Sequence, residues 1–193
     1  MADRPPLALA SASPRRLDLL ARIGVVPDAV HSTDTDETPR EDEVPHRLAA
    51  RLAAAKAEAA AAPSGSLVLA ADTVVGLGRR ILPKAGTGDE ARHCLDMLSG
   101  RRHRVATGVA LRLPDGRLRQ RLVVTVVAFQ RLTAAQIDDY LAGGEWRGKA
   151  GGYAIQGRAE CFVRFLSGSH SNVVGLPLFE TAQLLRGAGW LVP

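Results

Sequence analysis

Aromatic residues, cysteines and long apolar runs are all scarce in this chain of 193 residues. Aromatic side chains make up 4% of it, so Ala, Leu and Val supply most of the apolar surface. The two cysteines, Cys94 and Cys161, lie far apart and show no Cys-x-x-Cys spacing. Because a chain of this length does not need a disulfide, we expect free thiols in a reducing compartment.

Membrane and secretion signals are also lacking. No window approaches the ~18 consecutive apolar residues of a membrane-spanning helix. The apolar stretch near the N-terminus, Leu7 to Ala10, is much shorter than the roughly 7–15 residues of a signal-peptide core. The sequence therefore predicts a cytoplasmic protein without a membrane partner.

Common metal and nucleotide motifs are absent or incomplete. The five histidines show no His-Glu-x-x-His spacing and no pairing with cysteine, which excludes a zinc site of the usual kind. The segment GGEWRGKA, residues 143–150, nearly matches a P-loop, but it lacks the final Ser or Thr and follows a predicted helix. Gly76-Leu-Gly78 lacks the third glycine of a dinucleotide fingerprint.

The charge balance favours an acidic partner. The net charge is +5 and the isoelectric point is about 9.9. This alone suggests a nucleic-acid-binding module, whose duplex binding would depend steeply on salt. The arginines are scattered along the chain, however, and solvated faces explain most of them, so we expect no nucleic-acid partner.

Strands and helices are predicted to mix without strict alternation, which indicates an α/β fold with a mixed, twisted sheet in one domain, residues 1–193. Continuous apolar runs indicate buried strands, Asp115-Gly116 a hairpin turn, and Thr133 with Gln136 a capping box. The expected strands are Leu7–Ser11, 66–77, 104–113, 117–129 and 160–169. The expected helices begin at Pro14 (capped by Ser13), Pro45, Asp89, Thr133 and Pro177, and the segments 31–43 and 143–157 are loops.

Two adjacent arginines stand at a predicted helix start, in Ser13-Pro14-Arg15-Arg16. A helix N-terminus already has unpaired N–H groups and the positive end of a dipole. Cations there are unfavourable unless an anion joins them, and a polyphosphate would satisfy both the amides and the arginines. The alternative is that both side chains point into water, and the residues alone do not decide between the two.

Asp72 interrupts the apolar run LVLAADTVV. A carboxylate there needs a partner or a metal, because burying an unpaired charge is costly. It is either a structural acid bonded to backbone N–H groups or one of two carboxylates, with Glu37 of the polar loop, that bind a divalent cation. Two carboxylates plus phosphate oxygens suit Mg²⁺ or Mn²⁺.

Three lysines add positive charge. Lys56 is otherwise explained as the solvated face of its helix, Lys84 as a turn residue and Lys149 as a loop charge. Taken with the arginines and the two carboxylates, they fit an enzyme that neutralises the phosphates of a nucleotide and activates water.

Seven blocks in order carry a resemblance to a known family: LASASPRRLDLL, Asp36-Glu37, LAAAKAEA, AADTVV, ARHCLDMLSGRRHRVATGV, GKAGGYAIQG and GSHSNVVGLPLFET. From about Leu7 to about Leu185, the chain resembles the Maf family of nucleoside triphosphate pyrophosphatases, also called septum-formation-inhibitor-like proteins. The resemblance implies an inosine-triphosphatase-like α/β fold with a cleft between two lobes. It also implies cleavage of a nucleoside triphosphate to the monophosphate and pyrophosphate, with Mg²⁺, Mn²⁺ or Co²⁺.

The same resemblance implies roles for particular residues. Asp72 would be the general base and, with Glu37, would bind the metal. The Gln156-Gly157 pair and the VVGLPL block resemble the branch that acts on dTTP and UTP. The chain departs from the family's Gly-Lys-Pro by reading Pro83-Lys84-Ala85, which keeps the lysine. The implied catalytic residues are Asp72, Glu37, Lys56 and Lys84, and the implied substrate-binding residues are Ser13, Arg15, Arg16, Thr73, Lys149 and Gln156.

A second function class stays open. The family's older description is that of a non-catalytic regulator of cell division, which would not require the arginines and carboxylates to form a working site. An assay for pyrophosphate release separates the two classes. The resemblance also leaves a homodimer open, since relatives of this kind form dimers.

Overall fold

The computed structural model describes residues 4–190 and residue 192. Within these residues, seven strands form one sheet in the order β2-β1-β3-β5-β6-β7, with β4 paired to β3. The strands are β1 (Leu7–Ala10), β2 (Ala29–His31), β3 (Leu67–Leu77), β4 (Arg80–Leu82), β5 (Arg102–Arg112), β6 (Leu118–Phe129) and β7 (Val163–Ser167). The helices are α1 (Pro14–Arg22), α2 (Pro45–Ala59), α3 (Gly88–Leu98), α4 (Ala134–Ala142), the 3₁₀ helix η1 (Arg158–Phe162), α5 (His170–Val174) and α6 (Leu178–Arg186).

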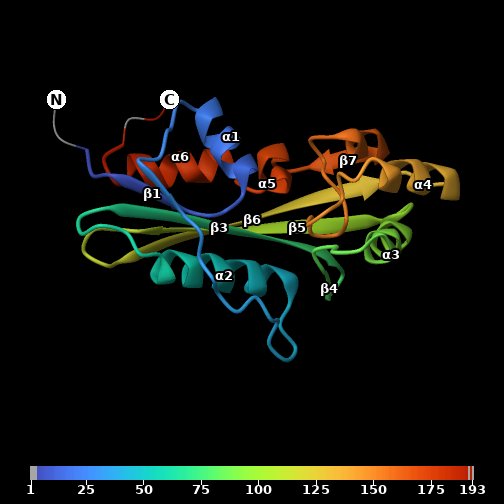
Figure 1. Cartoon of the computed structure of the whole chain (residues 1–193), viewed down its shortest axis with the longest axis horizontal. Helices are drawn as coiled ribbons and strands as arrows, with labels where there is room; N and C mark the ends of the chain where they lie inside the picture. Colours follow the sequence, from blue (N-terminus) through green and yellow to red (C-terminus); the bar gives the residue numbers. More distant parts are fainter. Residues whose placement is uncertain (1–3, 191, 193) are drawn as a thin grey trace.

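Helices cover both faces of this long sheet. Figure 1 shows α1, α5 and α6 on one face, α2 on the other, and α3 and α4 at one end. Strands β1, β2 and β3 are parallel, while β3, β5, β6 and β7 pair antiparallel. The predicted mixed sheet with flanking helices is therefore confirmed.

A notch in the edge of β3 positions the functional site. β5 occupies one edge of β3 from Val68 to Gly76, so β1 and β4 share the other edge. There, β1 pairs only as far as Ala70, and β4 pairs from Val75 onward. Within the described residues, no strand pairs with residues 71–74 on this edge. Since neighbouring side chains of a strand point to opposite faces of the sheet, the side chains of Asp72 and Thr73 point toward the helices on opposite faces.

Helix α2 lies unusually close to the sheet. Its buried residues include three alanines at helical spacing, Ala49, Ala53 and Ala57. On β5, Gly108 lies opposite Asp72, and a Cβ at Gly108 would lie only 2.8 Å from the Cα of Ala50. These small residues let the helix approach β3 and β5 closely. Lys56, near the end of α2, is thereby brought down to the notch and is only 8% exposed.

Several local predictions are confirmed and others are corrected. The turn at Asp115-Gly116 joins β5 to β6, with Gly116 at φ +84°, and Thr133 with Gln136 forms the predicted capping box. Ser13 does occupy the N-cap of α1, but its side chain makes no capping hydrogen bond. The strand predicted from residue 160 begins only at Val163, because residues 158–162 form η1. Strands β2 and β4 and helix α5 were not predicted, since three, three and five residues are too few for a periodic pattern. The loop predicted over 31–43 therefore begins inside β2, at His31.

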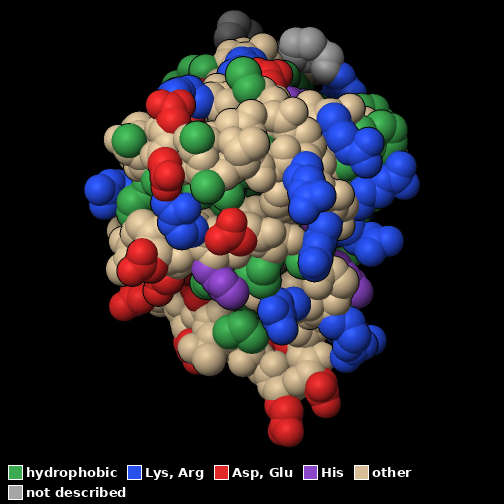
Figure 2. Space-filling view, turned by 90° about the vertical axis from the view of Figure 1, so that its right-hand side faces the viewer, with side chains coloured by type: hydrophobic (Ala, Val, Ile, Leu, Met, Phe, Trp, Pro, Cys, Tyr) green, Lys and Arg blue, Asp and Glu red, His purple; other side chains and the backbone are tan. Residues whose placement is uncertain are grey.

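The free thiols predicted from the sequence are present, while the compartment and the lack of membrane and nucleic-acid partners stay predictions. Cys94 and Cys161 are both free thiols. Among the described residues, no helix has the length and apolar character needed to cross a membrane. At the end of the molecule that carries α3 and α4, Lys and Arg gather along one side of the face and Asp and Glu along the other (Figure 2). Both signs of charge are therefore well represented on this face of the molecule (Figure 2).

Candidate active site

A cavity of about 430 Å³ opens at the notch in β3. Its walls come from the β1–α1 turn, α2, β3, the loop after β4, the glycine-rich segment before η1 and the end of α5. All ten residues singled out from the sequence line it: Ser13, Arg15, Arg16, Glu37, Lys56, Asp72, Thr73, Lys84, Lys149 and Gln156. The fold thus brings the separate sequence blocks to one place, while the role of each residue stays a prediction.

Two lysines and two carboxylates form a connected cluster on one wall. Lys56 Nζ donates to Asp72 Oδ1 at 2.5 Å and to Glu37 Oε1 at 2.6 Å. Lys84 donates to the other oxygen of Glu37. Lys56 therefore does not lie on a solvated helix face, and the partner of Asp72 is an ammonium rather than a set of backbone N–H groups.

The cluster keeps Glu37 ionised. Burial of this carboxyl would raise its pKa, but hydrogen bonds from Lys56 and Lys84 outweigh burial and lower the pKa to about 2. At neutral pH Glu37 is therefore a carboxylate, an acceptor-only group able to bind a cation.

The two arginines at the start of α1 have different surroundings. Arg16 donates from Nε to the carbonyl oxygen of Gly175 at 3.0 Å and from Nη1 to Ser11 Oγ at 2.8 Å. Its pKa is lowered, chiefly by burial and further by Arg15, although Asp72 and Glu37 oppose this. Arg16 therefore does not point freely into water, as one reading of the sequence had it. Arg15 is half-buried, and burial lowers its pKa as well.

A buried polar network holds the opposite wall. Thr73 Oγ1 lies 2.9 Å from Thr107 Oγ1, and Thr107 donates to the carbonyl oxygen of Asn172 at 3.0 Å. Asn172 is fully buried and donates from Nδ2 to the Val105 carbonyl oxygen. This network fixes α5 against the sheet and so places Gly175. Sequence reasoning missed Thr107 and Asn172, although Thr107, a polar residue in an apolar strand, was available as a signal.

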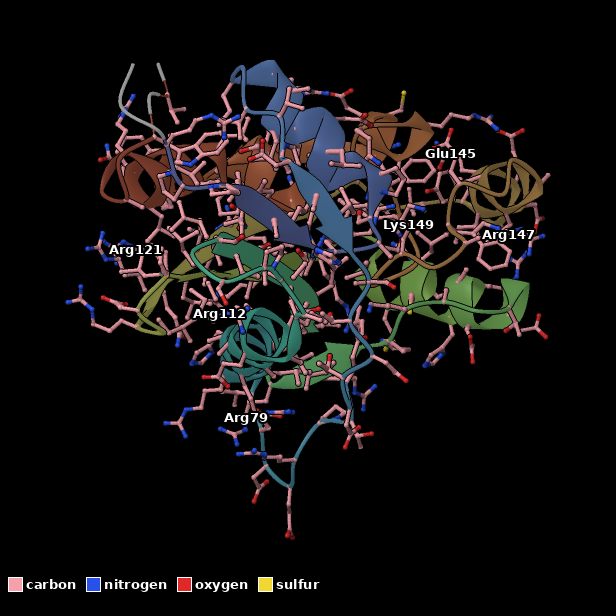
Figure 3. The ribbon with its side chains drawn as sticks, turned by 60° about the vertical axis from the view of Figure 1, so that its left-hand side comes forward. Arg79, Arg112, Arg121, Glu145, Arg147 and Lys149 are labelled. Atoms are coloured by element: carbon pink, nitrogen blue, oxygen red, sulfur yellow. The ribbon has the colours of Figure 1, made fainter. Side chains whose placement is uncertain are left out.

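The glycine-rich segment closes the third side. Lys84 and Ala150 form an antiparallel bridge, so the loop after β4 and the glycine-rich segment run side by side. Lys149 donates from Nζ to the Arg147 carbonyl oxygen at 3.0 Å, and its pKa is lowered by burial and then by Arg15. Figure 3 shows Lys149 on the inner side of this segment, with Arg147 farther out. Although the chain reads Pro83-Lys84-Ala85 in place of the family's Gly-Lys-Pro, Lys84 still contacts Glu37.

The donor set fits a hard divalent cation. Glu37 and Asp72 flank one ammonium, and both residues line the cavity. In the part of the chain that the structure describes, no group of three or more His, Cys, Asp or Glu side chains stands ready to bind a metal. Mg²⁺ is commonly bound by one or two carboxylates, with substrate phosphates and water completing its shell. Two carboxylates beside a cationic cavity match that pattern.

The chain is similar to known proteins over nearly its whole length. A family model described as "Maf-like protein" matches residues 6–188. A Rhodospirillum rubrum protein named "dTTP/UTP pyrophosphatase" is 65% identical over 186 residues, which cover 96% of this chain and 89% of that protein. A Caulobacter vibrioides protein of the same name is 60% identical over 191 residues, 98% of this chain and 99% of its own length.

A solved structure shares the fold. The HAM1 protein from Coxiella burnetii superposes with a TM-score of 0.53 over 95% of this chain and 99% of its own, at 17% identity. At that identity the likeness concerns the fold alone. It supports the α/β fold class predicted from the sequence.

Proposed function

This chain belongs to the Maf family, and we propose from this and from its cavity that it hydrolyses dTTP and UTP to the monophosphate and pyrophosphate. The relatives that bear this name are similar to the chain over nearly its full length. The observation that carries the proposal is Lys56, whose ammonium is shared between Glu37 and Asp72 on the wall of a cavity that Arg15 also lines.

Asp72 acts as the general base in this proposal. It is 3% exposed, and its Oδ1 is held by Lys56, so its other oxygen is left to accept a proton from water. The water oxygen forms a bond to one phosphorus of the α–β linkage. The bridging oxygen then leaves with the other phosphorus, and the water proton passes to Asp72. Lys56 fixes the carboxylate, which is the kind of positioning that such a step needs.

The cations neutralise the triphosphate. Arg15 is the second residue of α1 and Ser13 is its N-cap, so both stand at the positive end of the helix dipole. Lys84 and Lys149 line the cavity from neighbouring segments. Placing fixed positive charge around a phosphate chain stabilises the charge that develops in the transition state.

Glu37 and Asp72 would hold a divalent cation, Mg²⁺, Mn²⁺ or Co²⁺. When bound, such an ion supplies Lewis-acid neutralisation of phosphate oxygens. Gln156 and Thr73 would face the base, and the amide of Gln156 matches the N3–H and carbonyl pattern of uracil and thymine. A cytoplasmic location and a homodimer stay predictions.

The test is a panel of nucleoside triphosphates with identification of the products. We expect UMP and pyrophosphate from UTP, dTMP and pyrophosphate from dTTP, and loss of activity in excess chelator. Release of orthophosphate with a diphosphate product contradicts the proposal. Absence of turnover with every nucleotide would favour the non-catalytic regulator of cell division, and steeply salt-dependent duplex binding a nucleic-acid-binding module.

A further inference from the structure

The segment that carries Gln156 is held from outside the cavity. On one side of Gln156, the Ala154 N–H donates to Tyr140 Oη at 3.0 Å. On the other side, the Arg158 N–H donates to Glu145 Oε2 at 2.9 Å. Both acceptors come from α4 and the turn after it. Residues 154–158, here called the Gln156 segment, are thus fixed at both ends by two side chains close together in the chain.

Tyr140 is a buried residue of α4 that does not line the cavity. It is 1% exposed and packs edge-on against Phe162 with ring centroids 5.4 Å apart. Burial is the main reason that the pKa of its phenol is raised to about 12, so the hydroxyl stays protonated. A buried hydroxyl that accepts a backbone N–H holds that peptide in one orientation.

Glu145 fits against the backbone of Gly157. A Cβ at Gly157 would lie 2.8 Å from Glu145 Cδ, so the absent side chain is what lets the carboxylate reach the Arg158 N–H. The Arg158 guanidinium in turn forms an ion pair with Asp139 on α4. Figure 3 shows Glu145 near the segment that bears Lys149. These contacts join the two ends of the glycine-rich segment.

The segment needs such support because its own backbone is permissive. Gly151 and Gly152 precede it with φ of +68° and +69°, a region that only glycine enters readily. A side chain that distinguishes bases by hydrogen bonds must be held within about half an ångström of its working position. Without the contacts to Tyr140 and Glu145, a segment that follows two such glycines would allow the Gln156 amide to pair with several bases.

We propose that Tyr140 and Glu145 are positioning residues that set base selectivity by fixing the backbone on both sides of Gln156. This inference rests on the proposed function, in which Gln156 faces the base. Neither residue need touch the substrate. Their loss should alter which base is preferred more than it alters the phosphate chemistry, because the cluster of Lys56, Asp72 and Glu37 lies on another wall.

The test compares Tyr140→Phe, Glu145→Ala and Glu145→Gln with the wild type, using kcat/KM for UTP and GTP. Tyr140→Phe keeps the ring and removes the acceptor, so we expect the UTP-to-GTP ratio to fall about three- to tenfold, the loss of one hydrogen bond. Glu145→Ala should act alike. Glu145→Gln keeps an acceptor oxygen while removing the charge, so it should retain the ratio.

Ser99→Ala is the matched control. Ser99 Oγ also accepts a backbone N–H, that of Leu132, at 2.8 Å, but it lies at the end of α3 and does not line the cavity. We expect the melting temperature of Ser99→Ala to fall as that of Tyr140→Phe does, and its UTP-to-GTP ratio of kcat/KM to stay unchanged. If Tyr140→Phe and Glu145→Ala leave the UTP-to-GTP ratio of kcat/KM unchanged, whether or not both values fall, the positioning role is wrong.

A binding measurement separates this inference from the proposed function. Affinities for UMP and GMP, measured by calorimetry, do not require turnover. If the wild type prefers UMP and both Tyr140→Phe and Glu145→Ala lose that preference, the positioning role stands even where no pyrophosphate is released. If the wild type hydrolyses UTP but the variants keep its preference for UMP, the proposed function stands and the positioning role fails.

Discussion

Lys56 Nζ on α2 and Asp72 Oδ1 on β3 lie 2.5 Å apart, and both residues are almost fully buried. Neither charge could stay there alone, because an unpaired buried ion is costly. Lys56 is also bonded to Glu37, so one ammonium serves two carboxylates. Removing any single charge of this cluster should therefore change turnover or the free energy of unfolding, and both can be measured.

Asp72→Asn should abolish most turnover and leave the fold intact. Asn is nearly isosteric with Asp, but it neither accepts a proton from water nor replaces a carboxylate at a cation. Loss of a positioned base lowers the rate by about 10²–10⁴. Pyrophosphate release from UTP measures the loss, and circular dichroism checks the fold. Wild-type turnover in a folded variant would show that Asp72 is only structural.

Lys56→Met should destabilise the protein, because it leaves Asp72 buried without its ammonium. Removing one partner of a buried pair costs about 3–5 kcal/mol. The double variant Lys56→Met/Asp72→Asn should recover part of this loss, since both charges are then gone. Urea unfolding of the four proteins measures the coupling. Strictly additive losses would show that the pair contributes no interaction of its own.

Gln156→Glu should lower kcat/KM for UTP and dTTP by at least about tenfold. The change removes the amide donor and sets an anion against a base carbonyl, and a site that recognises its substrate by such bonds discriminates strongly when one is missing. Guanine presents adjacent N1–H and amino donors, so GTP should be affected less or improved. An unchanged UTP-to-GTP ratio means that Gln156 does not contact the base.

His103 should make the protein less stable at pH 5 than at pH 7. Burial lowers its pKa from 6.5 to about 4. Above pH 6.5 both states carry the neutral ring and no difference arises. Below it the unfolded chain binds a proton that the native state excludes, so stability falls by about 2 kcal/mol by pH 5.

His103→Gln removes this titration and keeps a polar side chain to contact the Tyr153 hydroxyl. Unfolding at both pH values should therefore show a smaller pH dependence in the variant than in the wild type. Parallel pH profiles for the two proteins would mean that His103 is not the group responsible.

Gly108→Ala should lower both stability and turnover, because the new Cβ would collide with the backbone of Ala49 and Ala50. Helix α2 would have to move off the sheet and take Lys56 with it. Gly88→Ala is the matched control: it begins α3 and no atom lies within 4 Å of the added Cβ. We expect Gly88→Ala to fold and turn over like the wild type. If Gly108→Ala does the same, α2 does not depend on this close approach.

Local signals in the sequence determined much of the fold. The Asp115-Gly116 turn, the Thr133–Gln136 capping box and the helix start at Pro14 each depend on neighbours within four residues, and all appear where predicted. The candidate site residues were found for a related reason. Charges such as Asp72 stand out because they interrupt apolar runs, and the order of the seven blocks identified the family.

What only the tertiary structure decided are the partners of those charges. The sequence left Arg15 and Arg16 as an undivided pair, and both line the cavity. The fold ties Arg16 alone to the carbonyl oxygen of Gly175, 159 residues away. The sequence left Lys56 on a solvated face or in a site, and the close approach of α2 to Gly108 buried it. Tyr140 and Glu145 gave no signal, because their partners are backbone N–H groups, which every residue but proline has and which carry no mark in the sequence.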